Sequence, residues 1–490
     1  MLEAAFESEQ MPDYHEGMLI LKVRSLPDMV ASMIAPEGTA AAGFSSPEVT
    51  EALSGAPGLS TLSVFERAGL IKQVVPLSRP AQQQTSLRPT GAMGILAASV
   101  EAPPPEDRNA GVNIVQVEND DDVPELQTAL GNDPSVEFVS RVPVRYLTVD
   151  SPGAGIEAVP PAASTMWNLQ KIQWEAAREL PSFREADDIQ VAVLDTGIDL
   201  NHPDLDQRVS SYVFEHPDLP SASSDQDIIG HGTHVSGTIT ANINNELGIN
   251  GICSCQLRVW KIFDDRPDCV RGAAPFFSSR FTYFVDPVMY QRALADCLDE
   301  GVDVINLSIG GQGQPDHNEL QLFNELLNNG TIIVAAMGNN RQGGSPIEFP
   351  GAIPGVIAVG ATSLDDTVAK FSTRGNHISL CAPGVAIWST LPTHPGQSGF
   401  DAITGLFGKC IQGKPHRRET DYDAWDGTSM ASPHVAAAVA LLLANKGKMS
   451  PADARDRLMA TAHDVPAMHG ADFDSDYGAG RLDLLRLLSP

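Results

Sequence analysis

Ile189–Leu205 reads IQVAVLDTGIDLNHPDL, and this stretch indicates the fold of most of the chain. Its first six residues are almost wholly apolar, and a Thr-Gly pair follows Asp195. A short apolar run that ends in a turn is typical of a strand buried on both faces of a parallel sheet. Ligands bind at the carboxyl ends of such strands. Asp195 is therefore expected at a site-forming edge, although an aspartate there is more often a turn or cap residue.

Further apolar runs alternate with helical segments along the rest of the chain. They lie at Leu257–Phe263, Val302–Ile309, Thr331–Ala336 and Val356–Val359. Strands that alternate with helices predict an α/β fold with a mostly parallel sheet and helices on both faces.

A second, smaller unit is expected before residue 150. Its strands are predicted at Leu19–Arg24, Ile71–Leu77, Val112–Val117 and Val136–Val142, and its helices near Pro47–Leu53, Leu62–Ala68 and Val123–Leu130. This βαβ–βαβ order predicts a small α+β, ferredoxin-like domain with an antiparallel sheet, interrupted by a polar insertion at Arg79–Arg108. A Pro-, Gly- and Ala-rich segment follows and indicates an exposed linker. We divide the chain into a domain at 1–149, a linker at 150–165 and a domain at 166–490.

Composition excludes several classes of protein. The 490 residues carry 32 Lys and Arg against 62 Asp and Glu, a net charge of −30, which disfavours nucleic acid and anionic membranes as partners. No apolar run approaches the roughly 18 to 20 residues that span a bilayer.

The acidic start lacks the pattern of a secretory signal, so a cytoplasmic location is expected, or secretion by another route. The six cysteines are expected to be buried free thiols of a reducing compartment.

Two further motifs carry side chains suited to catalysis. His231 lies between glycines in Gly230–Ile239, GHGTHVSGTI, and Ser429 begins an apolar helix in Asp426–Gly447, DGTSMASPHVAAAVALLLANKG. A lone histidine is usually structural, and a serine at a helix start is usually a cap. A zinc pair with His234 lacks the glutamate and the i, i+4 spacing of a zinc protease.

Together, the order Asp195, His231, Ser429 and the residues around each resemble the subtilisin-like serine proteases, the subtilases of peptidase family S8. The resemblance runs from about Trp167 to the C-terminus. It implies a serine endopeptidase that hydrolyses peptide bonds through an acyl-enzyme intermediate. His231 would take the proton of Ser429, and Asp195 would orient the imidazole.

The resemblance also implies an oxyanion hole and a substrate groove. Asn339, at the end of the apolar strand in IIVAAMGNN, falls where the family carries its oxyanion amide. Leu307–Gly311 resembles the segment that pairs with an extended substrate, and Ala336–Gly338 the opposite wall of the main specificity pocket. The expected substrate-binding residues are Ser308, Ile309, Gly310, Ala336, Met337 and Gly338. Met337 replaces a small residue and is expected to narrow a pocket that is apolar or uncharged.

This chemistry requires no cofactor. The family resemblance, however, implies a possible site for a structural calcium ion. Asp204 and Asn245 resemble two of its oxygen ligands, which backbone carbonyls nearby would complete.

The N-terminal domain resembles the propeptide of the family, which assists folding and inhibits the active site in the zymogen. The expected partners are thus a protein or peptide substrate and the chain's own N-terminal domain. We expect Ser429 to cut the chain between Arg145 and Ser164, with Tyr146 or Leu147 on the acyl side. An unrelated partner-binding domain is the alternative.

Two other functions stay open. One is a regulated binding or switch protein with a permanently occluded protease fold, and the other is an esterase or acyltransferase with the same triad.

Two insertions, Asp264–Asp286 and Leu391–Trp425, depart from the family pattern and are either surface decoration or substrate-selecting loops. The second insertion contributes an expected basic surface patch that includes His416 and Arg418.

Overall fold

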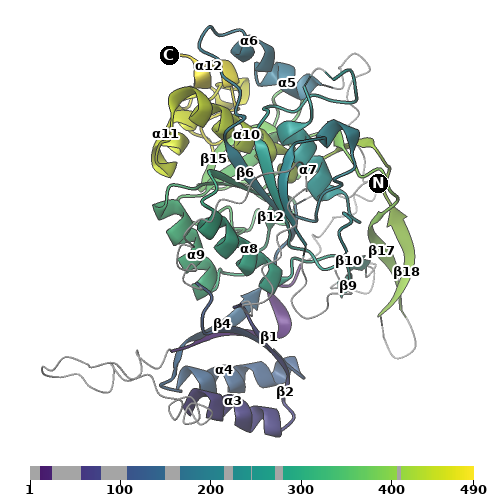
Figure 1. Ribbon diagram of the computed structural model, residues 1–490, viewed down its shortest axis with the longest axis vertical. Coiled ribbons are helices and arrows are strands. Elements are labelled where there is room, and N and C mark those ends of the chain that lie inside the picture. The colour runs from purple at the N-terminus through teal and green to yellow at the C-terminus, as the bar shows by residue number, and fades with distance from the viewer. Residues whose placement is uncertain are drawn as a thin grey trace, which may run out of the picture.

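The computed structural model describes residues 11–24, 57–78, 108–148, 166–214, 224–243, 245–270, 280–404 and 410–490. A large sheet flanked by helices forms the upper part of the molecule in Figure 1, and a smaller sheet with two helices lies below it.

The large sheet has seven strands, and all of its neighbouring strands run parallel. In spatial order they are β15 (Ile378–Pro383), β14 (Ile357–Thr362), β13 (Ile332–Ala336), β11 (Val304–Leu307), β6 (Gln190–Asp195), β8 (Gln256–Lys261) and β7 (Val209–Val213). The predicted parallel α/β fold is confirmed. The two edge strands, β7 and β15, were not predicted. Their sequences, VSSYV and ISLCAP, mix polar with apolar residues and lack the continuous apolar run of a central strand.

Helices cover both faces of this sheet, as predicted. Val191 and Val193 of β6 belong to the core shared with α10 (Thr428–Lys446) and α7 (His231–Thr240). Ala192 and Leu194 belong to the core on the opposite face, with α8 (Pro287–Glu300) and α9 (His317–Asn328). This alternation follows the two-residue period of a strand.

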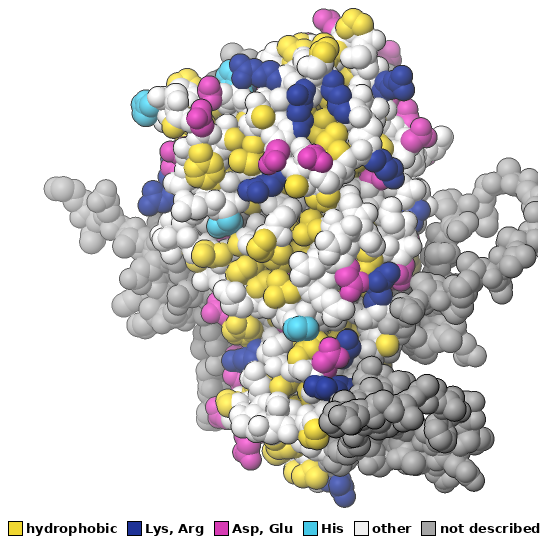
Figure 2. All heavy atoms as spheres, turned by 90° about the vertical axis from the view of Figure 1, so that its left-hand side faces the viewer, with side chains coloured by type: hydrophobic (Ala, Val, Ile, Leu, Met, Phe, Trp, Pro, Cys, Tyr) yellow, Lys and Arg dark blue, Asp and Glu magenta, His cyan; other side chains and the backbone are white. Residues whose placement is uncertain are grey.

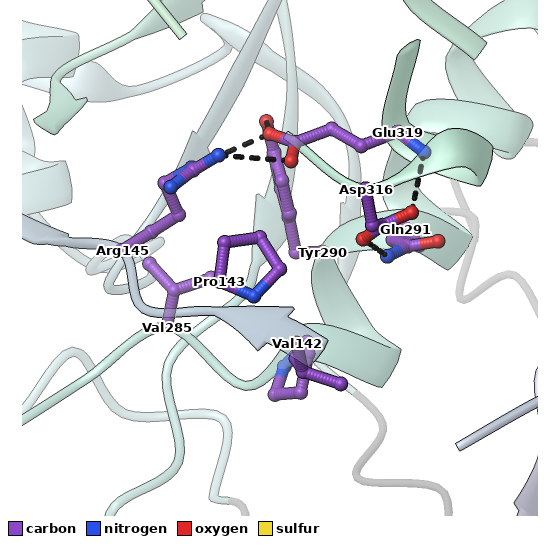
Figure 3. A pocket seen from close by; sticks show the side chains of 9 residues that line it. Val142, Pro143, Arg145, Val285, Tyr290, Gln291, Asp316 and Glu319 are labelled. Carbon is purple, nitrogen blue, oxygen red and sulfur yellow. Dashed lines mark hydrogen bonds and ion pairs between the residues drawn. The ribbon is translucent and has the colours of Figure 1, made fainter. Parts of the chain in front are cut away.

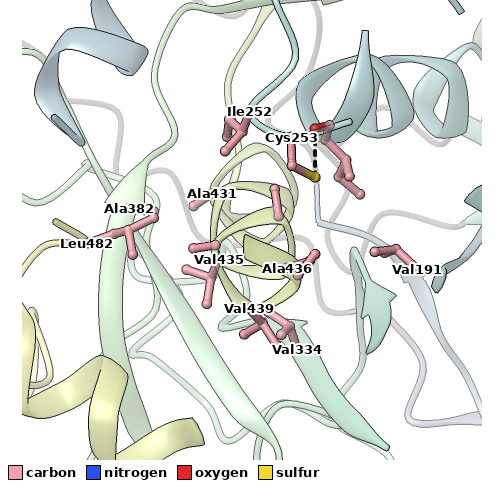
Figure 4. Close-up of a cluster of buried hydrophobic side chains, with 14 of the residues drawn as sticks. Val191, Ile252, Cys253, Val334, Ala382, Ala431, Val435, Ala436, Val439 and Leu482 are labelled. Atoms are coloured by element: carbon pink, nitrogen blue, oxygen red, sulfur yellow. Dashed lines mark hydrogen bonds between the residues drawn. The ribbon is translucent and has the colours of Figure 1, made fainter. Parts of the chain in front are cut away.

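Helix α10 runs through the centre of the first core. Figure 4 shows Ala431, Val435, Ala436 and Val439 of this helix among side chains of the neighbouring strands. The helix is long and apolar enough to cross a membrane by length and composition, but 89% of its most apolar window is buried inside the protein. Burial in the core accounts for its composition.

The remaining elements of this domain are short. They are α5 (Trp167–Lys171), α6 (Trp174–Arg178), α11 (Pro451–Thr461), α12 (Leu484–Leu488), β12 (Ile309–Gly310), β16 (Ile387–Thr390), β19 (Tyr422–Trp425) and the 3-10 turns η3 (Pro203–Leu205) and η5 (Pro466–Met468).

The small N-terminal sheet is antiparallel, as predicted, with strand order β2-β3-β1-β4. Its elements are β1 (Tyr14–Val23), α3 (Pro57–Arg67), β2 (Ile71–Pro76), β3 (Val112–Val117), η2 (Asp120–Asp122), α4 (Val123–Gly131), β4 (Val136–Pro143) and, further on, β5 (Tyr146–Leu147). Both helices lie on one face of the sheet, below it in Figure 1. The helix expected near Pro47–Leu53 and almost all of the Arg79–Arg108 insertion lie outside the described residues.

The other face of the small sheet packs toward the large domain. Ile20, Ile114 and Val142 form an apolar cluster with Val288 of α8. Arg292 of α8 donates hydrogen bonds of 2.9 Å and 2.8 Å to the carbonyls of Leu77 and Pro76 at the end of β2. The two domains therefore share an apolar and hydrogen-bonded contact despite their common negative charge.

The two insertions form one accessory sheet. Its strand order is β18 (Cys410–Arg417), β17 (Gln397–Thr404), β10 (Arg280–Thr282) and β9 (Asp268–Val270). A disulfide joins Cys269 to Cys410 across 141 residues of sequence. The expectation of six free thiols is wrong for this pair, whereas Cys253, Cys255, Cys297 and Cys381 are free and buried.

Charged side chains are interspersed on the face seen in Figure 2, which carries acidic, basic and apolar groups without a large basic surface. Of the basic patch expected in the second insertion, Lys414, His416 and Arg417 are exposed, whereas Arg418 does not lie on the surface. Arg418 is buried and donates to the carbonyls of Asp227 and Ile228, and His416 lies 2.7 Å from Asp401.

Candidate active site

Asp195 and His231 form a buried pair at the carboxyl edge of the large sheet. Asp195 ends β6, and His231 begins α7 immediately after Gly230, which adopts a left-handed conformation. The carboxylate oxygen Oδ1 lies 2.7 Å from His231 Nδ1 and also accepts a hydrogen bond from the Thr196 amide. This contact fixes the ring so that Nε2 is the nitrogen left for proton transfer.

A second carboxylate holds the first turn of α7 against the end of β6. Asp227 accepts hydrogen bonds from the Thr196 hydroxyl, the Gly230 amide and both the amide and hydroxyl of Thr233. Gly232 permits the close approach, since a Cβ there would lie 2.1 Å from the Gly197 carbonyl oxygen. Asp227 thereby sets where His231 stands, and no motif in the sequence pointed to it.

A second histidine, His234, lies near His231 and is uncharged. His234, one turn along α7, stacks on Trp425 with ring centroids 5.1 Å apart, and its Nε2 lies 3.0 Å from the Ile387 carbonyl. Burial lowers the pKa of His234 to about 3, so it carries no charge at neutral pH. It therefore supports the position of α7 and forms no metal pair.

Ser429 lies in the first turn of α10, as predicted, but its hydroxyl does not contact the histidine. It donates to the Ser308 carbonyl at 2.9 Å and lies 2.6 Å from the Thr148 hydroxyl. His231 Nε2 has no hydrogen-bond partner among the described residues. The structure thus brings Asp195 together with His231. The Ser429 hydroxyl contacts Ser308 and Thr148 in place of His231.

The carbonyl of Thr148 lies between two donors that point at one oxygen. The side-chain amide of Asn339 donates to it, and so does the Ser429 backbone amide at 3.4 Å. The Asn339 side chain is oriented in turn, because its Oδ1 accepts from the amide and hydroxyl of Thr428 at 3.0 Å and 2.8 Å. Two such donors around a carbonyl oxygen are the arrangement that stabilises a negative oxygen in acyl transfer.

The segment before Thr148 lies in the groove as an added strand. β5 pairs antiparallel with β12, with Leu147 opposite Ile309 and Tyr146 opposite Gly310. Extended peptides commonly bind by adding a strand to an exposed edge in this way. The predicted segment Leu307–Gly311 therefore does pair with an extended chain, which here is the protein's own.

A buried ion pair holds the chain just before β5. The Arg145 guanidinium donates to both oxygens of Glu319, at 2.9 Å and 3.3 Å, and both side chains are about 1% exposed. Figure 3 shows this pair beside a small pocket lined by Val142, Tyr290 and Asp316 among others. Burial and the neighbouring Glu319 raise the pKa of Asp316 to about 7. The pair fixes where the chain turns from β4 toward the groove.

The residues expected to line the substrate groove lie at the ends of neighbouring strands, and one expectation about them is wrong. Ser308, Ile309, Gly310, Ala336, Met337 and Gly338 are all buried or nearly so at the ends of β11, β12 and β13. The Met337 side chain, however, packs into a separate apolar cluster with Ile378, Met468 and Tyr477. It does not narrow the pocket, because it turns to the other side of the chain.

The pocket also contains a buried titratable side chain, which the expectation of an apolar or uncharged pocket did not include. The carboxylate of Glu348 lies against both Gly310 and Gly338, and the residue is 1% exposed. Burial raises the pKa of Glu348 to about 8. Glu348 sits in a polar loop that reads as a turn in sequence, so no sequence signal marked it.

Asp204 and Asn245 do not fit a calcium ion as arranged. Both oxygens of Asp204 accept hydrogen bonds, from Asn245 Nδ2 at 2.7 Å, the Ile249 amide at 3.1 Å and the Tyr422 hydroxyl at 3.3 Å. The Leu247 amide donates to Asn245 Oδ1, which keeps the amide nitrogen toward Asp204. The described residues contain no group of three or more His, Cys, Asp or Glu side chains placed to hold a metal. No step of the chemistry is assigned to a metal here.

Known proteins are similar in sequence to the larger part of this chain. A model of the subtilase family, peptidase family S8, matches residues 186–480. Subtilisin E of Bacillus subtilis (strain 168) is 33% identical over 278 residues, which make up 56% of this chain and only 60% of that protein. Subtilisin BL of Lederbergia lenta is 33% identical over 302 residues, or 61% of this chain and 92% of that protein.

One solved structure is similar over nearly the whole chain. The crystal structure of fervidolysin from Fervidobacterium pennivorans, described as a keratinolytic enzyme related to subtilisin, superposes with a TM-score of 0.59. The match covers 99% of this chain and 62% of that one at 22% sequence identity. At this level of identity, the likeness between the two structures shows a shared fold and nothing more.

Proposed function

This chain belongs to the subtilase family, and from that membership we propose that it is a serine endopeptidase made as a self-inhibited precursor. One observation carries the proposal. The carbonyl oxygen of Thr148 receives hydrogen bonds from Asn339 and from the Ser429 amide, while β5 pairs with β12. The N-terminal domain therefore presents its own chain in the manner of a substrate.

The proposed chemistry assigns one role to each buried group. Ser429 Oγ attacks the carbonyl carbon of the acyl-side residue as His231 Nε2 takes its proton. The resulting oxyanion is held by the Asn339 amide and the Ser429 backbone amide. His231 then gives the proton to the leaving amine, and a water molecule hydrolyses the acyl-enzyme by the same route. Asp195 keeps the imidazole in the required tautomer throughout.

For its own chain, we propose cleavage of the bond between Thr148 and Val149. The earlier expectation placed Tyr146 or Leu147 on the acyl side. The pairing of Leu147 with Ile309 instead favours Thr148, because it puts the next carbonyl between the two donors. After cleavage, the acyl-side segment remains paired with β12, so the N-terminal domain acts as an inhibitor until it is removed.

The experiment compares the full-length wild type with Ser429→Ala by intact mass. Wild type is expected to yield a fragment ending at Thr148, and Ser429→Ala to remain intact. A matched control is Ser432→Ala, which removes another buried hydroxyl of α10 and should still be processed. If Ser429→Ala is cut at the same bond, the self-processing proposal fails.

A fluorophosphonate probe separates the enzyme from the alternative of a permanently occluded switch protein. Labelling of Ser429 after removal of residues 1–148 supports the enzyme, and absence of labelling supports the switch. The esterase or acyltransferase alternative is disfavoured because the pairing of β5 with β12 uses backbone groups that only a peptide offers.

For location, we propose an oxidising compartment reached by export. The Cys269–Cys410 disulfide supports this choice over the cytoplasm, where such bonds are rare.

A further inference from the structure

The carboxylate of Glu348 lies between the two glycines of the pocket walls. A Cβ built on Gly310 would stand 2.7 Å from Glu348 Oε2, and one on Gly338 would stand 2.5 Å from its carboxyl carbon. The same point on Gly310 is 2.7 Å from the methyl group of Thr148. The carboxylate therefore occupies the slot into which the side chain at position 148 projects.

This carboxylate has no matching positive charge. Its Oε1 lies 3.5 Å from the Thr373 hydroxyl, and Oε2 has no hydrogen-bond partner among the described residues. No lysine, arginine or histidine of the described chain forms an ion pair with it. A buried, unpaired carboxylate is costly, so burial raises the pKa of Glu348 to about 8, with Thr373 and Tyr146 offsetting only part of the effect. The group is therefore mainly protonated at neutral pH until a cation pairs with it and stabilises the ionised form.

We propose that Glu348 makes this pocket select a cationic side chain, lysine or arginine, on the acyl side of the bond cut in protein substrates. The inference rests on the proposed function and names its substrate class. A cationic group that reaches the carboxylate would supply the missing partner of Oε2. Charge-assisted hydrogen bonds in a site that excludes water are the strong ones. A buried polar group left unpaired by the wrong substrate gives large discrimination.

Thr148 itself fits this assignment as a poor ligand that is cut because it is tethered. Its short, uncharged side chain leaves the carboxylate unpaired, and the contact it does make is with Ser429. An intramolecular substrate needs little affinity from this pocket, since the N-terminal domain holds it in place. A departing propeptide then leaves the pocket to side chains that bind it better.

The test uses processed protein, freed of residues 1–148 and normalised by fluorophosphonate titration of Ser429. Four peptides differ only in the acyl-side residue, which is lysine, arginine, leucine or threonine. We expect kcat/KM for lysine and arginine to exceed that for leucine at least tenfold. Glu348→Gln should lower that ratio at least tenfold. Asp316→Asn, which removes another buried carboxylate that accepts from Gln291 and the Glu319 amide, should leave the ratio as it is.

A second measurement does not depend on the folding of a variant. Benzamidine and benzamide have the same shape, but only benzamidine is cationic. Benzamidine should inhibit the wild type at least tenfold more strongly than benzamide. A wild type that prefers threonine or leucine, or that is inhibited equally by both compounds, would overturn the inference.

The failure of this inference differs from failure of the proposed function. If Ser429 is labelled and the leucine peptide is cleaved without any preference for lysine or arginine, only the role of Glu348 is wrong. If Ser429 is not labelled and none of the peptides is cleaved, the endopeptidase proposal falls and the specificity falls with it.

Discussion

The Thr148 carbonyl accepts a hydrogen bond from the side chain of Asn339, which lies 191 residues further along the chain. This single contact joins the end of the N-terminal domain to the loop that follows β13. It identifies which backbone oxygen stands where charge would develop during cleavage.

Replacing Asn339 by alanine removes one of two donors to that oxygen. We expect kcat on a peptide substrate to fall about 100- to 1000-fold with a much smaller change in KM, because the contact strengthens as the oxygen becomes negative. Steady-state kinetics on processed protein measures this. Asn340→Ala is the control, since the Asn340 backbone amide, not its side chain, binds Thr373. Equal losses in both variants would contradict the assignment.

Replacing Arg145 by methionine leaves Glu319 buried without its partner. Breaking a buried pair costs about 3 to 5 kcal/mol, so the Ser429→Ala precursor should lose stability of that order in urea. Arg108→Met removes partly exposed contacts to Asp299 and Glu325 and should cost about 1 kcal/mol or less. Similar losses for the two variants would show that the buried pair contributes nothing special.

The stability of the precursor should fall as pH rises through the range set by Asp316. Its pKa is raised to about 7 in the folded protein, chiefly by burial, so the folded state keeps a proton that the unfolded chain has already lost. The stability present near pH 4 is therefore lost progressively up to about pH 7. Urea unfolding of the Ser429→Ala precursor at several pH values measures the slope.

Asp316→Asn should flatten that slope between pH 4 and 7. Asparagine is a good helix cap and keeps the bond to the Glu319 amide at the start of α9. Glu348 contributes a slope of the same sign up to about pH 8, so some slope remains. An unchanged profile in Asp316→Asn would mean that Asp316 titrates normally.

Replacing Cys269 and Cys410 by serine should loosen the accessory sheet and leave the large sheet intact. Hydrogen exchange should rise in β9, β10, β17 and β18, while β6 and β11 stay protected, because the bond links only the two insertions. Dithiothreitol should reproduce this in the wild type and add nothing to the double variant. Loss of protection throughout the large sheet would show that the insertions support the core.

Much of the fold and the site was predictable, since it rests on local patterns. β3 begins and ends at Val112 and Val117, where its apolar alternation does, and Asp195 ends β6 where the apolar run stops. The pairing of Leu307–Gly311 with an extended chain followed from the family resemblance. The edge strands β7 and β15 did not, since edge strands need less apolar sequence.

What the sequence could not reveal depends on contacts between distant loops. Glu348 reaches the slot only because its loop folds back on Gly338, and Cys269 meets Cys410 only because two insertions pair as strands. The acyl-side residue was off by one or two positions, because register across β5 and β12 is set by the docking of a whole domain. None of these arrangements leaves a local pattern.

The bond between the Thr148 and Ser429 hydroxyls gives the residue before the proposed cleavage site a second contact with the nucleophile. In this arrangement the nucleophile faces Ser308 and Thr148, and His231 Nε2 has no hydrogen-bond partner among the described residues. The residue at the proposed cleavage site thus helps to hold the hydroxyl that would attack it. A valine at position 148 would remove this hydroxyl contact and leave the Ser308 carbonyl as the remaining acceptor for Ser429.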